Sequence, residues 1–129
     1  MLIDIRRRQT ASLLPNLTLN QLLARASIQC HGVKLNQPDW SDQSHSLAIA
    51  ASAVTADLDL YLMLNAYWEP LQFELPPASA DALRPWRRWL DTFSEPPDDI
   101  CLLSNARPVA GSSYLVHARS VVALARMAE

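Results

Sequence analysis

The residues of this chain that could do metal or acid–base chemistry are its three histidines and two aspartates of one loop. His31, His45 and His117 lie on three separate segments, without the short spacing that zinc ligands usually share. Single histidines near strand ends are more often structural hydrogen-bonding groups, so we expect that role here. The sequence therefore indicates no metal site.

Asp39 and Asp42 belong to the run "PDWSDQSHS", residues 38–46. Two carboxylates serve as acid and base where their environments separate their pKa values, and the run shows no apolar pocket that would do so. Aspartates in loops commonly cap turns, and we expect that role. With only two glycines and no G-x-S-x-G motif, the chain offers neither a serine nucleophile elbow nor a phosphate-binding loop. We expect no catalytic residue and no cofactor.

Aromatic side chains are the remaining candidates for binding, because a flat ring can cover the apolar face of a pyranose. Trp40, Tyr67 and Trp68 fall in predicted loops and are candidate carbohydrate contacts. Core or interface packing is the commoner role of such rings. For Tyr67 and Trp68 the alternative is that they mainly turn the chain between two strands. Trp86 and Trp89 are expected on opposite faces of one strand, so at most one of them can join the core.

The residues around Tyr67 and Trp68 alternate with a period of two, which predicts strands. Leucines at every second position from Leu58 to Leu64 make the first segment apolar on nearly both faces, as in a central strand. Residues 71–75 alternate between apolar and polar side chains. We interpret the two segments as a β-hairpin with a loop longer than the tight two-residue connections.

About seven short strands separated by turn signals predict an all-β fold, an antiparallel β-sandwich or barrel. The predicted strands are Ile28–Val33, Ser46–Val54, Leu58–Ala66, Leu71–Leu75, Trp86–Asp91, Ser113–Ala118 and Ser120–Ala125. Short helical segments are expected before them. One runs from Leu2 to Leu14 and is stopped by Pro15, and the other begins at Thr18 with a capping-box pattern.

Composition restricts the classes of partner. A chain of 129 residues that is half hydrophobic suits one folded domain, and a net charge of −2 gives no general attraction for nucleic acid. No apolar run approaches the length of a membrane span, and the N-terminus lacks the pattern of a signal peptide. Cys30 and Cys101 match no metal or redox spacing, so we expect free thiols. These features predict a cytoplasmic protein without nucleic-acid or membrane partners.

Five segments, taken in order, resemble a known domain. They are "HGVKLNQPDWSDQSHSLAIA", "YLMLNAYWEPLQFELPP", "WRRWLDT", "PDDI" and "SSYLVHARSVVAL". Together they resemble the C-terminal domain of isoamylase-type glycogen debranching enzymes, members of the α-amylase superfamily. The opening "LIDIRRRQTASL" is similar to the last helix of the catalytic barrel in those enzymes, and "NLTLNQLLARASI" to the connector that follows. Residues 1–25 would then be the barrel end plus connector, and residues 26–129 the β-sandwich domain.

The resemblance implies a β-sandwich that packs against a (β/α)8 barrel and stabilises it, in an enzyme that hydrolyses α-1,6 linkages of glycogen or related glucans. The family's catalytic aspartates and glutamate belong to the barrel, which takes at least about 200 residues, and none of their motifs occurs here. The chain alone is therefore expected to be inert, with a catalytic barrel as its partner in cis or in trans. Two alternatives stay open, a stand-alone module that binds α-glucan through Trp40, Tyr67 or Trp68, and a protein-interaction sandwich.

A sandwich built to cover a barrel would also carry an apolar surface in the isolated chain, and exposed apolar patches favour association. Apolar residues of the first predicted helix would add to that surface. They are Leu2, Ile3, Ile5, Leu13 and Leu14. The sequence therefore also predicts a homodimer that shares this surface.

Overall fold

The computed structural model describes residues 3, 27–55, 58–77 and 84–127. The helical segments predicted within residues 1–25 lie outside the described residues, apart from Ile3. The strands are β1 (Ser27–His31), β2 (Ser46–Thr55), β3 (Leu58–Asn65), β4 (Leu71–Glu74), β5 (Arg87–Asp91), β6 (Arg107–Pro108), β7 (Ser113–Val116) and β8 (Ser120–Met127), with one 3-10 turn, η1 (Leu103–Asn105), before β6.

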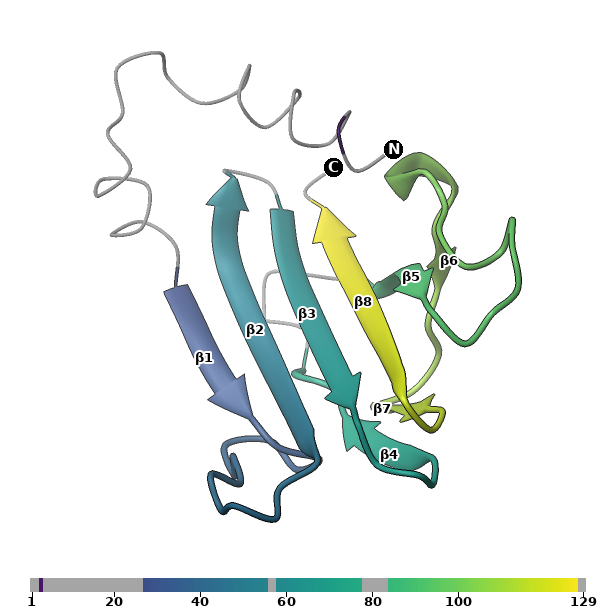
Figure 1. The fold of residues 1–129 in the computed structure, drawn as a ribbon. Helices are drawn as coiled ribbons and strands as arrows, with labels where there is room; N and C mark the ends of the chain where they lie inside the picture. The colour runs from purple at the N-terminus through teal and green to yellow at the C-terminus, as the bar shows by residue number, and fades with distance from the viewer. Residues whose placement is uncertain (1–2, 4–26, 56–57, 78–83, 128–129) are drawn as a thin grey trace.

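The strands form two antiparallel sheets (Figure 1). The larger sheet has six strands in the order β1-β2-β3-β8-β5-β6, and the smaller one pairs β4 with β7. All seven predicted strands are present, and their ends lie within two residues of the predicted ones. The additional strand β6 was not expected, because two residues are too few to show a period. The all-β prediction is confirmed for the part of the chain that the structure describes.

The hairpin predicted from residues 58–64 and 71–75 is wrong. β3 pairs with β2 on one side and β8 on the other, whereas β4 pairs only with β7 in the smaller sheet. The connection between β3 and β4 thus carries the chain from one layer to the other (Figure 1). Alternation predicted both strands correctly, but it contains no information about which strand each one pairs with.

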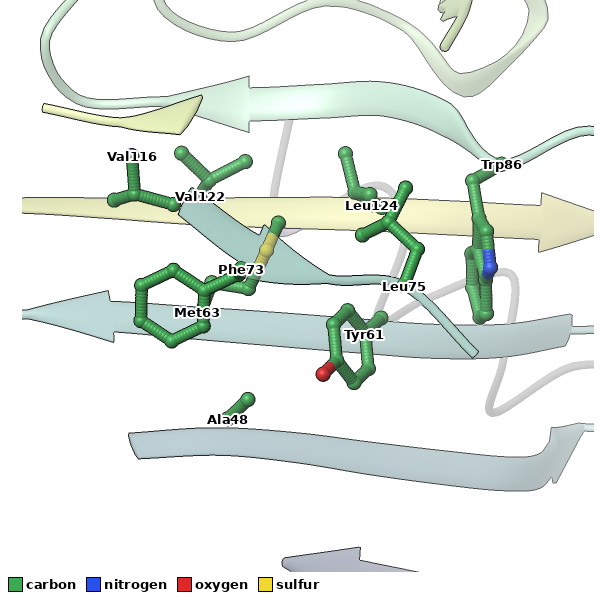
Figure 2. Close-up of a cluster of buried hydrophobic side chains, with 9 residues drawn as sticks. All are labelled: Ala48, Tyr61, Met63, Phe73, Leu75, Trp86, Val116, Val122 and Leu124. Atoms are coloured by element: carbon green, nitrogen blue, oxygen red, sulfur yellow. The ribbon is translucent and has the colours of Figure 1, made fainter. Parts of the chain in front are cut away.

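The core lies between the two sheets. Side chains of β2, β3 and β8 point toward those of β4 and β7, and the ring of Trp86 closes one end (Figure 2). The buried cluster comprises Ala48, Tyr61, Met63, Phe73, Leu75, Trp86, Val116, Val122 and Leu124. Trp86 joins this cluster and Trp89 does not, as the strand geometry predicted.

Trp86 and Arg126, at one end of the core, each have a polar contact with another segment of the chain. The Trp86 indole N–H donates to the carbonyl of Pro76 at 3.0 Å. The guanidinium of Arg126 lies 4.3 Å from the centre of the Trp86 ring, and it also contacts the carboxylate of Asp59 at 3.4 Å. This arrangement joins the end of β8 to the segment before β5, so that the tryptophan covers the core without leaving its N–H unpaired.

Tyr61 links the two layers through a polar atom in an otherwise apolar core. Its side chain is fully buried, and its hydroxyl donates to the backbone carbonyl of Glu74 at 3.1 Å. Burial, and then the negative charge of Glu74, raise the pKa of Tyr61 to about 12. The ionised phenolate is disfavoured here because it would lose its water and could no longer donate this hydrogen bond.

This raised pKa predicts an alkaline loss of stability. Below pH 10 the phenol is protonated in both states, and as the pH rises from about 10 to about 12 the unfolded chain ionises first. The contribution of Tyr61 to the free energy of unfolding is therefore complete below pH 10 and is lost as the pH approaches 12. In urea unfolding, the free energy of unfolding of the Tyr61→Phe variant should fall less steeply above pH 10 than that of the wild-type chain. Equal declines in the two proteins would contradict this assignment.

Candidate binding surface

The turn after β3 is organised by the buried side chain of Asn65, which is only 2% exposed. Its Nδ2 group donates to the carbonyls of Glu69 at 2.9 Å and of Val116 and His117 at 3.1 Å each. Its Oδ1 accepts the backbone N–H of Tyr67 at 2.9 Å. One amide therefore forms hydrogen bonds with backbone groups of both the β3–β4 and the β7–β8 connections. Asn65 thereby fixes the point at which the chain leaves the larger sheet.

Backbone hydrogen bonds tie neighbouring loops to this turn. The N–H of Ala66 donates to the carbonyl of His45 at 2.8 Å, and the N–H of Arg119 donates to the carbonyl of Tyr67 at 3.1 Å. Arg119 has a φ of 52°, the left-handed conformation that non-glycine residues rarely adopt. Segments far apart in the sequence thus form one connected loop end of the sandwich.

The predicted contacts Tyr67 and Trp68 take different positions in this loop end. The ring of Tyr67 is partly buried and stacks on His45, with ring centres 5.1 Å apart and planes 9° apart. Trp68 is 66% exposed, and its ring meets that of Tyr67 edge to face at 71°. Tyr67 therefore belongs to the turn, as the packing alternative expected, whereas Trp68 presents its ring to solvent.

The third predicted contact, Trp40, is 67% exposed in the loop before β2. Within the described residues it stacks on no other aromatic ring. Its neighbour Asp39 accepts the N–H of Ser41 at 3.0 Å, and this hydrogen bond lowers the pKa of the Asp39 carboxyl. Asp39 thus caps a local turn, as predicted, and the structure does not join Trp40 to the other two aromatic residues through a ring contact.

The three histidines occupy three separate sites. His31 is buried and its Nδ1 accepts the N–H of Asn36 at 2.8 Å. His45 stacks on Tyr67, and His117 stacks on Phe93 with ring centres 3.7 Å apart. No group of three metal-ligating side chains occurs in the ranges that the structure describes. For His31 the structural role predicted from the sequence is confirmed.

A buried carboxylate that the sequence analysis did not single out lies on β5. Asp91 is 4% exposed, accepts the Tyr114 hydroxyl at 3.0 Å through Oδ2, and accepts the N–H of Phe93 at 3.0 Å through Oδ1. Burial, and then the charge of Asp91, raise the pKa of the Tyr114 phenol. Both carboxylate oxygens of Asp91 accept hydrogen bonds within the fold. We therefore interpret the Asp91–Tyr114 pair as a structural link between β5 and β7.

A shallow depression lies between the ends of β3 and β8. It is lined by Leu64, Asn65, Ala66, Arg119, Ser120 and Val121. Its floor is mostly apolar, and Arg119 supplies the charged group on its margin. Since Asn65 and Ala66 directly precede Tyr67, the depression adjoins the loop that carries Trp68.

The side of the larger sheet that faces away from β4 and β7 is also apolar, and we call it the outer face. Its members include Leu47, Ile49, Leu60, Leu62, Leu64, Leu90, Val121, Ala123 and Ala125. One row crosses four strands, since Leu62 pairs with Ile49 on β2 and with Ala123 on β8, which in turn pairs with Leu90. The two alanines are buried between larger neighbours, while Leu60, Leu62 and Leu64 of β3 stay partly exposed. A continuous apolar stripe thus covers the sheet centre.

Fold and surface together define a β-sandwich domain with one apolar sheet face and one loop end that carries exposed rings. The model of the family described as "Isoamylase 1-3, C-terminal" matches residues 29–123, and the chain belongs to that family. No curated protein sequence matches the chain significantly. The predicted resemblance to isoamylase C-terminal domains is therefore confirmed. Across the described ranges no helix is long and apolar enough to cross a membrane.

The central role of Asn65 predicts a large effect from a small substitution. Asn65→Asp keeps the acceptor for Tyr67 but turns a carboxylate oxygen toward three carbonyl oxygens. We expect the free energy of unfolding in urea to fall by on the order of 3 kcal/mol, because buried polar groups lose their partners and like partial charges meet. Asn105→Asp, in the exposed turn η1, is the matched control and should change stability little. Equal effects of the two substitutions would be inconsistent with this role.

Proposed function

We propose that this chain is the non-catalytic C-terminal domain of a glycogen debranching enzyme, an isoamylase-type α-1,6-glucosidase, and that it packs against the catalytic barrel and stabilises it. The single observation that carries this proposal is the apolar outer face. The core of the sandwich lies on the opposite side of the same sheet, so the leucines of the outer face are not needed to hold the two sheets together.

The composition of the outer face supports a permanent contact rather than a transient one. Interfaces between subunits that stay together resemble a divided core, whereas transient ones are more polar. The central row of Ile49, Leu62, Ala123 and Leu90 contains no charged or hydroxyl side chain. Burying such a row contributes roughly 25 cal/mol per Å² of apolar area, although association also loses translational and rotational freedom.

In this proposal hydrolysis belongs to the barrel, and the chain alone cleaves no glucan. Two carboxylates support a structural assignment, because Asp39 caps a turn and Asp91 on β5 accepts hydrogen bonds from Tyr114 and Phe93. A cytoplasmic location fits the two free cysteines, Cys30 and Cys101, since thiols stay reduced there.

Docking can be tested in trans with an isoamylase catalytic barrel produced without its own C-terminal domain. Addition of the wild-type chain should raise the melting temperature of the barrel, by an amount that grows with the chain's concentration; a hundredfold excess over Kd corresponds to about 2.7 kcal/mol. Leu62→Glu places a charge in the centre of the outer face and should abolish the effect. Glucan hydrolysis by the chain alone serves as the blank and should stay at the level of buffer.

The matched control is Leu115→Glu. Leu115 lies on β7 of the smaller sheet, outside the outer face, and is 43% exposed. The Leu115→Glu variant should stabilise the barrel as well as the wild-type chain does. If Leu62→Glu retains a native near-ultraviolet spectrum and still raises the melting temperature, or if the wild type has no effect, the outer face is not the docking surface.

In the absence of a barrel we propose that the outer face pairs with a second copy of the chain. Light scattering coupled to size exclusion at micromolar concentration should give the mass of a dimer for the wild type and for Leu115→Glu. Leu62→Glu should shift the mass to that of a monomer, because the charge would be buried without a partner. A wild-type monomer, or a dimer that survives Leu62→Glu, would show that the chain does not associate through this face.

A further inference from the structure

We propose that Trp68 is the stacking platform of an α-glucan binding site at the loop end of the sandwich, beside the end of the outer face that carries Leu64 and Val121. The choice of an α-glucan as the ligand rests on the proposed function, because it is the polymer that the parent enzyme would act on. The existence of a platform rests on the geometry of this chain alone.

The first supporting observation is the way the Trp68 ring is presented. The side chain is 66% exposed, although burying an indole is strongly favourable. Its neighbour Tyr67 meets it at 71°, so the two rings do not stack face to face. With two thirds of the side chain open to solvent, the indole offers surface to a pyranose ring, whose axial C–H groups form an apolar surface of similar size.

The second observation is that the platform has a rigid support. Tyr67 stacks on His45, its N–H is held by Asn65, and its carbonyl accepts the N–H of Arg119. Each of these partners belongs to a different connection or strand end. A ring mounted on such a support loses less conformational freedom on binding than one on a free loop, which favours affinity.

The third observation concerns the polar groups beside the ring. A glucan exposes hydroxyl groups around the edge of each apolar pyranose face and needs donors and acceptors next to the stacking ring. Arg119 lines the adjoining depression and has five N–H donors, and Glu69, directly after Trp68, is exposed. Within the loop itself, the exposed neighbours of Trp68 are the small Ala66 and the charged Glu69, and such a setting suits a hydroxyl-rich ligand better than the apolar centre of a protein interface.

Isothermal titration of the full chain with maltoheptaose tests the proposal, with cellohexaose as the probe for linkage specificity. The wild type should bind maltoheptaose, and Trp68→Ala should weaken binding about tenfold, the effect of losing one stacking contact. Quenching or a shift of tryptophan fluorescence should accompany binding in the wild type and disappear in Trp68→Ala. The far-ultraviolet spectra should be unchanged, because the ring contributes little to the core.

Trp40→Ala provides a closely matched control, since Trp40 is 67% exposed on a neighbouring loop and lacks the stacked support. Its affinity for maltoheptaose should equal that of the wild type. No binding by the wild type, equal losses in Trp40→Ala and Trp68→Ala, or equal affinity for cellohexaose would each overturn the proposal. Leu62→Glu should bind the glucan normally, so that a failure of docking and a failure of this site give different results.

Discussion

The hydrogen bonds of the Asn65 side chain are the interaction on which the arrangement of the two sheets depends. The chain leaves the larger sheet after β3 and must enter the smaller one at β4, so the peptide groups of the turn cannot continue either ladder. Asn65 supplies donors to the carbonyls of Glu69, Val116 and His117 and an acceptor to Tyr67. Without that amide, several polar groups would be buried unpaired at the point where the two layers meet.

β3 ends at Asn65, and its two faces have different roles. Tyr61 and Met63 on one face pack between the sheets, while Leu60 and Leu62 on the other face form the centre of the outer face. The strand is fixed in register by β2 and β8 on its two sides. A shift by one residue would exchange the two sets of side chains and would place Asp59 among the leucines. The register of β3 therefore determines both the internal core and the surface proposed for docking.

The sequence predicted the strands but not how they pair. Alternation from Leu58 to Leu64 was sufficient to locate β3 and to assign it a central position, because side-chain period and burial are coupled locally. The partner of β4 could not be predicted, since β7 lies about forty residues further on and nothing local specifies it. Likewise, Trp40 and Trp68 look equivalent in the sequence, and the hydrogen bonds and ring contacts around Tyr67 distinguish them in the structure.

Stability and proposed binding are separated within the same turn. Asn65 and Tyr67 are held in the fold by hydrogen bonds and by the stack on His45, and therefore belong to the structure of the sandwich. Trp68, the next residue along the chain, contributes little to the core, since two thirds of it stays exposed. Its ring meets the ring of Tyr67 edge to face, and Tyr67 is held by the fold. Trp68 can therefore be substituted without loss of the sandwich, whereas Asn65 cannot. This difference is the physical basis for proposing a binding role for Trp68 and a folding role for Asn65.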